Sequence, residues 1–422
     1  MTKPTGLDSL EQVAGNGLLH RRLFLQGGAA ALAGATLLTA RAAPPDVPKS
    51  MTTPGSPMRA YGERSPHEAR VQRTVGATAG AAGTGSSRTP LESLEGIITP
   101  SALHFERHHN GVPDIDPAQH QVLIHGLVER PLIFSMDALA RYPMVSRIQF
   151  LECSGNSGGN NNAEAPQQTA GGIHGLVSCS DWAGVPLAVL LDEAGVKPEG
   201  RWLLAEGADA AGMSRSVPMA KAMDDAFLAL YQNGERLRPE QGYPVRLFLP
   251  GYEGNMSVKW LRRIKVTAEP TMTKDETSKY SDLQPNGRSL LFTFPMEVKS
   301  VITSPSGTQA MQGPGLYQVS GVAWSGFGRV RRVEVSADGG KSWAQAALDG
   351  PVLTQALTRF RMPWRWDGSP SVLMSRAVDE TGAVQPTRAA LMTARGAAFR
   401  YHYNAIQSWN VAAAGAVSNV YV

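Results

Sequence analysis

The fold is decided by the stretch SRIQFLECSGNSGGN, which occupies residues 146–160. Residues 146–151 are rich in apolar side chains and predict a β-strand, which leads directly into Glu152, Cys153 and a loop of glycine, serine and asparagine. Functional side chains are often found where a rigid element gives way to a polar loop. Backbone N–H groups in such a loop can stabilise a thiolate. Cys153 is therefore the first candidate for a functional residue.

Strands and short helices are expected on both sides of this junction. Ser135 can cap a short helix that ends before Pro143. Regular leucine spacing predicts another helix over residues 186–194, which should stop at Gly195. Further strands are predicted at residues 120–126, 243–251 and 257–266. This mixture of elements predicts an α+β domain, which we place at residues 97–290.

After residue 290 the pattern changes to short alternating segments separated by turns. Residues 337–341 form a predicted hairpin turn ahead of Trp343. Strands are predicted at residues 315–324, 330–336, 359–366 and 372–379. Short strands with frequent turns indicate a β-sandwich of about 100 residues. We place it at residues 291–410, followed by a C-terminal tail over residues 411–422.

The amino-terminal residues are predicted to be an export signal. Arg21 and Arg22 stand directly ahead of an apolar run over residues 23–38. Residues 40–42 follow as an A-x-A cleavage site. This arrangement indicates a twin-arginine signal over residues 1–42, with an ordinary amphipathic helix as the alternative. The run is shorter than the ~20 residues that span a bilayer, so no membrane span is expected.

The twin-arginine route carries proteins that are already folded, often with a cofactor in place. We therefore expect a periplasmic protein with a bound cofactor. Residues 43–96 are rich in proline, glycine, serine, threonine and alanine. This composition predicts a flexible arm that follows the cleaved signal.

The composition excludes several classes of protein. Lys+Arg 40 and Asp+Glu 36 among the 422 residues give a formal net charge of +4, without the basic blocks of a nucleic-acid binder. The two cysteines are too few for a disulfide framework, a zinc cluster or an iron–sulfur ligand set. The sequence has no Cys-x-x-Cys-His motif, so no covalent haem is expected on this chain. A redox role would require another cofactor or another polypeptide.

The residues alone leave two interpretations of Cys153 open. A soft thiolate suits a soft or high-valent metal. Alternatively, Cys153 is a buried structural residue, or it pairs with Cys179 in a disulfide in the oxidising periplasm. Cys179 lies in an apolar segment and is predicted to be a buried filler of the core.

A series of motifs resembles the sulfite oxidase family of molybdenum-cofactor proteins. The motifs are Phe105-Glu106-Arg107-His108-His109, the Cys153 loop, Gly242-Tyr243-Pro244-Val245-Arg246, Pro250-Gly251, Ser257-Val258-Lys259-Trp260, and the later stretches 323–326 and 335–343. The resemblance covers about residues 97–410. It implies an α+β, sulfite oxidase-like molybdopterin-binding domain followed by an Ig-like β-sandwich through which the chain dimerises.

The resemblance also implies a cofactor and the residues that hold it. The cofactor is molybdenum bound by a pyranopterin dithiolene (molybdopterin), with Cys153 as the protein's thiolate ligand. Tyr280 and Arg107 would line the substrate side and, with Cys153, form the catalytic set. The implied cofactor-binding residues are Phe105, Arg107, His109, Cys153, Asp209, Gln241, Arg246, Ser257, Val258 and Lys259. Arg, Lys and backbone donors suit a phosphorylated, anionic cofactor, and a carboxylate suits the N–H edge of a pterin ring.

The chain departs from the sulfite-oxidising members at the substrate pocket. Ser157 and Gly158 stand where those members have arginines, and His402 aligns loosely with the late arginine that clamps sulfite. Gly172 falls near a family tryptophan, and Gln241 replaces a histidine. Sulfite is a small dianion that generally needs several charge-assisted hydrogen bonds. The departures therefore imply a wider and less cationic pocket.

With these departures the sequence resembles the molybdenum subunits of the sulfane dehydrogenases. Their substrate is a sulfane sulfur on a cysteine of a carrier protein, oxidised during thiosulfate oxidation. The resemblance implies electron transfer to a c-type cytochrome partner, a homodimer formed through the Ig-like domain, and a heterotetramer with the cytochrome as a further possibility. Two alternatives remain open: a periplasmic sulfite dehydrogenase, and a cofactor-free scaffold that holds the cytochrome.

Overall fold

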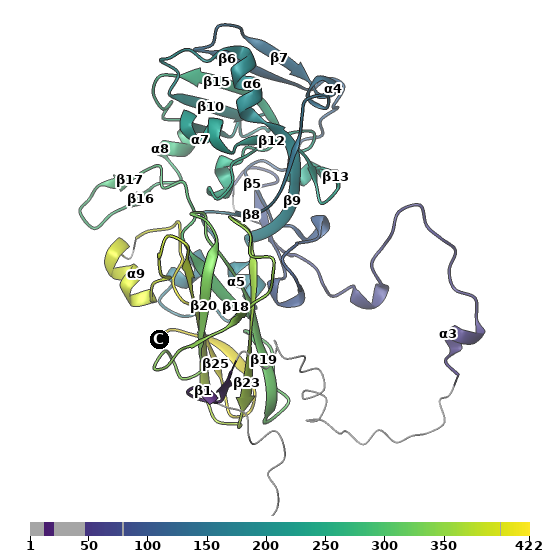
Figure 1. The fold of residues 1–422 in the computed structure, drawn as a ribbon, viewed down its shortest axis with the longest axis vertical. Helices are drawn as coiled ribbons and strands as arrows, with labels where there is room; N and C mark the ends of the chain where they lie inside the picture. Colours follow the sequence, from purple (N-terminus) through teal and green to yellow (C-terminus); the bar gives the residue numbers. More distant parts are fainter. Residues whose placement is uncertain (1–11, 21–46, 78–79, 397) are drawn as a thin grey trace, which may run out of the picture.

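The computed structural model describes residues 12–20, 47–77, 80–396 and 398–422. Two bodies rich in β-structure lie one above the other in Figure 1, with strands β8 and β9 between them. The expected arginine pair, apolar run and cleavage site, residues 21–42, lie outside the described residues. Among the helices that the structure describes, none is long and apolar enough to cross a membrane.

The upper body is an α+β domain, as the sequence predicts. Its outer sheet has the order β11-β10-β15-β6-β7, in which only β15 and β6 run parallel. These strands are β6 (Gln121–Gly126), β7 (Leu132–Ser135), β10 (Trp202–Gly207), β11 (Ser214–Pro218) and β15 (Leu261–Thr267). Residues 257–260, predicted to begin the last of these strands, instead form a loop that contributes to the site.

A second sheet of the upper body carries the Cys153 loop. Its order is β13-β12-β9-β8, with β14 also paired to β12. The strands are β8 (Val145–Glu152), β9 (Val177–Pro186), β12 (Phe227–Gln232), β13 (Glu235–Arg236) and β14 (Arg246–Phe248). The predicted strand at residues 146–151 is thus confirmed. Strand β14 is shorter than the predicted 243–251.

Helices cover and connect these sheets. In α4 (Met136–Leu139), Oγ of Ser135 accepts a hydrogen bond from the N–H of Ala138 at 3.1 Å, which confirms the predicted cap. In α6 (Leu187–Ala194), Gly195 ends the helix with φ 70°, as predicted. The other helices of the upper body are α7 (Met219–Asp224) and α8 (Lys274–Thr277), with 3₁₀ turns at Pro239–Gln241 and Gly254–Met256. Helix α5 (Ala170–His174), preceded by a 3₁₀ turn at Gly158–Asn161, packs instead against β18 (Lys299–Ser304) of the lower body.

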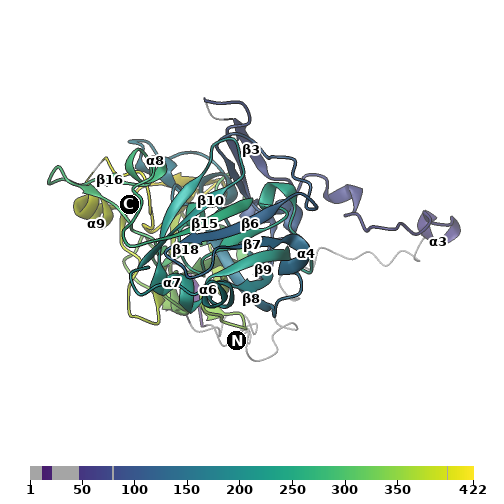
Figure 2. The same cartoon turned by 90° about the horizontal axis from the view of Figure 1, so that it is seen from above.

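The prediction of a flexible arm over residues 43–96 is wrong for the second half of this segment. Strands β3 (Thr74–Ala77), β4 (Gly85–Arg88) and β5 (Glu106–His108) form a sheet, and 3₁₀ turns at Leu91–Ser93 and Ser101–Leu103 lie between β4 and β5. Thr89 is fully buried. The small residues of this segment gave no apolar pattern, because backbone pairing between β4 and β5, rather than burial of apolar side chains, holds it in place. The earlier part, with α3 (Lys49–Thr52) and the turn Pro66–Glu68, extends away from the body in Figure 2.

The lower body is a β-sandwich, as predicted. One sheet has the order β1-β2-β23-β19-β18, with β22 also on β23, and the other has the order β21-β20-β24-β25-β26. The strands are β18 (Lys299–Ser304), β19 (Gly315–Trp324), β20 (Val330–Ser336), β21 (Ala344–Gln345), β22 (Ala347–Leu348), β23 (Thr358–Trp366), β24 (Ser371–Asp379), β25 (Ser408–Val411) and β26 (Val417–Val420). The prediction of a separate C-terminal tail over residues 411–422 is therefore wrong, because β26 is the last strand of the second sheet.

Smaller elements lie beside the junction of the two bodies. These are the hairpin β16 (Asp282–Leu283) with β17 (Ser289–Leu290), and helix α9 (Arg388–Arg395). One hydrophobic cluster also crosses the junction, joining Phe150 and Val177 to Val301, Val322 and Trp324 of the sandwich. Strand β8, which leads into Cys153, is thus packed against both bodies.

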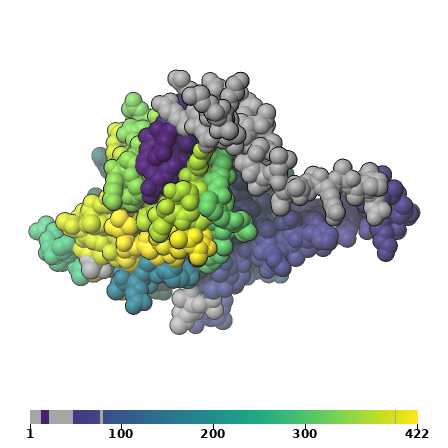
Figure 3. Space-filling view, turned by 90° about the horizontal axis from the view of Figure 1, so that it is seen from below, coloured from purple at the N-terminus to yellow at the C-terminus, as the bar shows by residue number. Residues whose placement is uncertain are grey.

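Residues 12–19 were predicted to belong to the export signal, but they fold onto the sandwich. They form the hairpin β1 (Gln12–Ala14) and β2 (Leu18–Leu19), which continues the sheet beyond β23. Figure 3 shows this purple hairpin seated on the green and yellow surface of the sandwich.

Candidate active site

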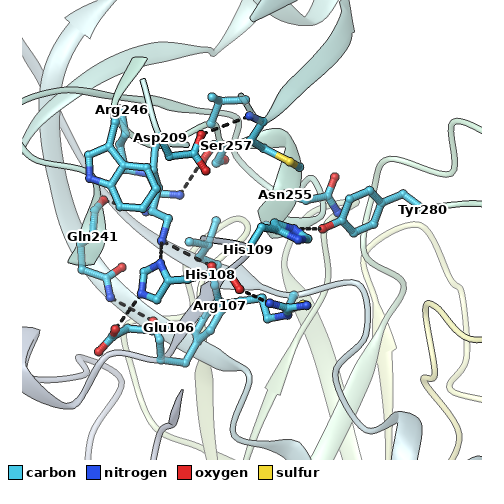
Figure 4. Close-up of a pocket in the computed structure, with 18 residues that line it drawn as sticks. Glu106, Arg107, His108, His109, Asp209, Gln241, Arg246, Asn255, Ser257 and Tyr280 are labelled. Carbon is cyan, nitrogen blue, oxygen red and sulfur yellow. Dashed lines mark hydrogen bonds and ion pairs between the residues drawn. The ribbon is translucent and has the colours of Figure 1, made fainter. Parts of the chain in front are cut away.

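All the site residues expected from the sequence line one cavity of the upper body, with an empty volume of about 670 Å³. Figure 4 shows their side chains converging from loops that follow several strands. The lining consists of Phe105, Glu106, Arg107, His108, His109, Leu151, Cys153, Asp209, Met213, Gln241, Arg246, Gly254, Asn255, Ser257, Val258, Lys259, Trp260 and Tyr280. Segments far apart in the sequence are thus brought to one place.

Cys153 lies at the end of β8, where the chain turns into the polar loop. Its N–H donates to the carbonyl of Leu176 at 2.9 Å, and its carbonyl accepts from the N–H of Asn156 at 2.8 Å. Burial raises the pKa of the thiol, although a hydrogen bond from the backbone of Gly155 and the charge of Arg107 act in the opposite direction. The loop donor expected from the sequence is present, but burial outweighs it in this structure.

The two cysteines are both free, so the disulfide alternative is wrong. Cys179 is fully buried on β9 and belongs to the cluster that crosses the junction. Burial raises its pKa to about 12. Cys179 is therefore the core residue that the sequence predicted, and Cys153 remains the candidate ligand.

Glu152, which precedes Cys153, is held by the sandwich. Its Oε1 accepts from Nζ of Lys299 at 3.2 Å and from Nδ2 of Asn156 at 2.9 Å, and its Oε2 accepts from Nε1 of Trp324 at 2.6 Å. Lys299 and Trp324 lie on β18 and β19. The position of the Cys153 loop therefore depends on both bodies of the protein.

Tyr280 closes one side of the cavity beside Cys153. Its hydroxyl lies 3.1 Å from Nε2 of His109, and the guanidinium carbon of Arg215 lies 4.8 Å from the centre of its ring. Desolvation and the nearby Cys153 sulfur raise the pKa of Tyr280 well above its usual value. Burial and the charge of Arg107 lower the pKa of His109 to about 4. Near neutral pH this corner holds a protonated phenol and a neutral imidazole.

The opposite end of the cavity holds two cations, the half-buried Lys259 and the buried Arg246. Nζ of Lys259 lies 2.8 Å from Nδ1 of His108 and donates to carbonyl oxygens of Arg107 and Glu240. Arg246 donates to the carbonyls of Gln241 and Ser257, and its Nε has no hydrogen-bond partner among the described residues. None of these partners is a carboxylate.

The energetics of these cations point to an anionic ligand. Desolvation and the charge of Arg246 lower the pKa of Lys259 well below its usual value, and burial lowers that of Arg246 to about 9. Buried charges are costly unless they are paired. A phosphate at this end would supply the missing countercharge and an acceptor for the free N–H.

The remaining expected residues shape the walls. The side chain of Gln241 donates to the carbonyl of Phe105 at 2.9 Å, so it links two of the motifs. Oγ of Ser257 accepts from the N–H of Leu249 at 3.0 Å. Asp209 lines the cavity, with Oδ1 accepting from the N–H of Met213 at 3.1 Å.

Among the positions that differ from the sulfite-oxidising members, Gln241 lines the cavity, whereas Ser157, Gly158, Gly172 and His402 lie outside this lining. Ser157 is buried, with Oγ 2.7 Å from Nδ1 of His174 and 2.6 Å from Nζ of Lys299. His402 is buried between Glu297 at 2.9 Å and Glu253 at 3.4 Å. Burial lowers the pKa of His402, but these carboxylates raise it to about 10. Its positive charge is thus already compensated inside the protein.

Sequence reasoning missed several residues of the site. Glu106, His108 and Trp260 stand within quoted motifs and could have been included, whereas Met213 and Asn255 gave no signal. Arg88, on the strand predicted to be a flexible arm, is half-buried; desolvation lowers its pKa, and the charge of Cys153 acts in the opposite direction. Tyr401 packs against Tyr280 with ring centres 5.5 Å apart.

Two family models match the chain and together cover both bodies. The model described as "Oxidoreductase molybdopterin binding domain" matches residues 109–274, and that described as "Mo-co oxidoreductase dimerisation domain" matches residues 291–408. Sulfite oxidase of Gallus gallus is 32% identical over 327 residues, which are 71% of this chain and 71% of that protein. The chain therefore belongs to the sulfite oxidase family of molybdenum-cofactor oxidoreductases. The expected fold, cofactor and enzyme class are confirmed.

Within this family, one solved structure is similar over nearly its whole length. The sulfane dehydrogenase SoxCD from Paracoccus pantotrophus matches with a TM-score of 0.87 and 46% identity, over 89% of this chain and 98% of that chain. The NADH nitrate reductase of Solanum lycopersicum is 33% identical over 351 residues, which are 72% of this chain but 38% of the reductase. The chain thus spans less than two fifths of that reductase.

The residues present fit the molybdenum cofactor. The cavity joins a free thiol, Cys153, to the half-buried Lys259 and the buried Arg246, two cations that have no carboxylate partner. Asp209 provides a carboxylate in the same lining for the N–H edge of a pterin. The donor set therefore matches the metal, the ring and the phosphate of one elongated ligand.

Proposed function

We propose that this protein is the molybdenum subunit of a sulfane dehydrogenase, which oxidises a sulfane sulfur held on a cysteine of a carrier protein. The observation that carries the proposal is the match to sulfane dehydrogenase over 98% of that chain at 46% identity. When bound, the cofactor supplies oxygen-atom transfer and accepts two electrons.

The charges at the substrate end support a tethered sulfane over free sulfite. Among the cavity-lining residues, Arg107 supplies the fixed positive charge near Cys153, while Lys259 and Arg246 are assigned to the phosphate. His109 is neutral because its pKa is about 4. A small dianion generally needs several charge-assisted hydrogen bonds. One guanidinium suits a persulfide, which carries less charge.

The residues that line the cavity would then have the following roles. Cys153 is the thiolate ligand, and Arg107 orients the anionic end of the substrate. The hydroxyl of Tyr280, kept protonated by its raised pKa, donates a hydrogen bond toward the reacting sulfur. His109 holds that hydroxyl at 3.1 Å. Phe105, Gln241, Ser257 and Val258 shape the walls that exclude water around the cofactor.

The partners follow from the chemistry. No haem motif is present, so electrons would pass to a c-type cytochrome subunit, and the carrier would enter the cavity with its persulfidated cysteine. The sandwich, which matches the dimerisation model, would form a homodimer, with a heterotetramer if the cytochrome binds each copy. The arginine pair and the cleavage site would direct the folded chain to the periplasm by the twin-arginine route.

Mass spectrometry of a carrier protein tests this proposal. The carrier, with a persulfide on its cysteine, and free sulfite are each incubated with the molybdenum-loaded protein, the cytochrome partner and water labelled with ¹⁸O. We expect the carrier to gain labelled oxygen on its outer sulfur as the cytochrome is reduced. Labelled sulfate formed from free sulfite, with an unchanged carrier, would instead support the sulfite dehydrogenase.

A further inference from the structure

The hairpin of residues 12–19 lies in the segment that the sequence assigns to the export signal. It is nevertheless built into the sandwich: Leu18 is fully buried and belongs to the hydrophobic cluster of the sandwich, and Val13 and Ala14 pack against that cluster. Leu18 pairs with Trp364 of β23 in an antiparallel register. A leader segment that docked nowhere would bury none of these side chains.

Hydrogen bonds fix the hairpin at a specific place. The N–H of Arg365 donates to the carbonyl of Gly17 at 2.8 Å, and Nε1 of Trp364 donates to the carbonyl of Asn16 at 2.6 Å. Nδ2 of Asn16 donates to the carbonyl of Ala337 at 2.9 Å. The N–H of Gly15 donates to Oγ of Ser342 at 2.7 Å. Both sheets of the sandwich thus contribute partners.

The turn of the hairpin is encoded locally. Asn16 and Gly17 have φ 53° and 85°, and with Gly15 they form the three-residue turn between the paired residues Ala14 and Leu18. A Cβ on Gly17 would lie 1.9 Å from the carbonyl oxygen of Arg365. The close approach of the two backbones therefore requires glycine at this position.

We propose that this edge of the sandwich binds the leader of its own chain in the precursor, and that the docked hairpin slows delivery of the arginine pair to the export machinery. The inference rests on the export signal of the proposed function. Arg21 comes two residues after Leu19, so the pair starts directly at the end of the docked strand. The machinery can use only the fraction of chains whose leader is released, which lowers the apparent rate. Cleavage after residue 42 would remove the hairpin from the mature protein.

Hydrogen exchange on purified precursor, isolated from cells that lack the export machinery, tests the docking. We expect slow exchange in residues 12–19 and in residues 359–366. Gly17→Ala should speed exchange of residues 12–19 and of the Arg365 N–H, which donates to Gly17, at least tenfold, because the added Cβ cannot fit. The rest of residues 359–366 stays paired with β19 and β22 and should remain protected. Gln12→Ala, at an exposed position of the same hairpin, is the control and should match the wild type. Rapid exchange of residues 12–19 in the wild type would overturn the proposal.

Transport of the same precursors into export-competent membrane vesicles tests the consequence. Gly17→Ala should be transported at least twofold faster than the wild type. Ser342→Ala, which leaves the leader sequence intact, should change the rate in the same direction. An unchanged rate in Gly17→Ala despite lost protection would refute the effect on delivery. An intact mass of the exported protein that includes residues 12–19 would show that the leader is not cleaved after residue 42. This outcome is independent of the sulfane activity, which is tested on the carrier protein.

Discussion

Nζ of Lys299 in the sandwich lies 3.2 Å from Oε1 of Glu152, the residue directly before Cys153, and their side chains are 2% and 1% exposed. This ion pair crosses the junction between the two bodies at the point where the metal ligand is positioned. The sandwich, which matches a dimerisation model, therefore also contributes to the site. It fixes the loop that carries the candidate ligand.

We expect Lys299→Met to destabilise the protein by about 3 kcal/mol, because it leaves the carboxylate of Glu152 buried without its countercharge. The double variant Glu152→Gln/Lys299→Met should recover most of this loss. Urea unfolding measures both. Lys197→Met is the control, because its pair with Glu129 is long, at 3.9 Å, and exposed, and should change stability by less than about 0.5 kcal/mol. Equal effects of Lys299→Met and Lys197→Met would refute the role of the buried pair.

Cys153→Ser should fold normally and retain the pterin but lose oxidative turnover, because a hydroxyl is a harder and poorer ligand for this metal. Activity is compared at matched molybdenum content. Cys179→Ala serves as the control: it should cost on the order of 1 kcal/mol of stability and keep its turnover. Near-wild-type activity of Cys153→Ser would exclude the ligand role.

Lys259→Met should have opposite effects on the apoprotein and on cofactor binding. Removing a half-buried ammonium that has no carboxylate partner should stabilise the apoprotein. The same change should lower the amount of pterin that copurifies at least tenfold, because the phosphate loses a partner. Thermal unfolding and pterin fluorescence measure the two quantities. A destabilised apoprotein with full pterin content would contradict the assignment of Lys259 to an anion site.

His402 should make stability fall as the pH rises above neutral. Its pKa of about 10 in the folded protein lies above the ordinary value, so the folded state binds the proton more tightly than the unfolded chain. This contribution is complete below pH ~6.5 and is lost as the pH rises to about 10, with a slope of at most about 1.4 kcal/mol per pH unit. Urea unfolding between pH 6 and 9.5 should show a shallower decline for His402→Gln. Parallel curves would show that His402 is not the responsible group.

Much of the site was accessible from the sequence because its residues stand in short motifs. Arg107, Arg246 and Lys259 were found in this way, and all line the cavity. Arg215 and Tyr401 were missed because each comes from a segment without a motif, and only the fold brings them to Tyr280. A pattern of residue types along the chain cannot reveal such contacts.

The structure also changes the interpretation of the departures from sulfite-oxidising relatives. Ser157 and His402 are buried among Lys299, Glu253 and Glu297 rather than facing the cavity. Arginines placed there would have to displace these ion pairs before reaching a substrate. The order of residues 74–96 could not be predicted either, because their small side chains show no apolar pattern and the segment is held by backbone pairing with β5.

The central claim is that the substrate is a carrier-bound sulfane rather than free sulfite. The most direct measurement is kcat/KM for both substrates with the same molybdenum-loaded preparation and the same cytochrome acceptor. We predict a kcat/KM for the persulfidated carrier at least a hundredfold above that for sulfite, and a loss of both activities in Cys153→Ser. Efficient oxidation of free sulfite, with no turnover of the carrier, would contradict the claim and identify the protein as a sulfite dehydrogenase.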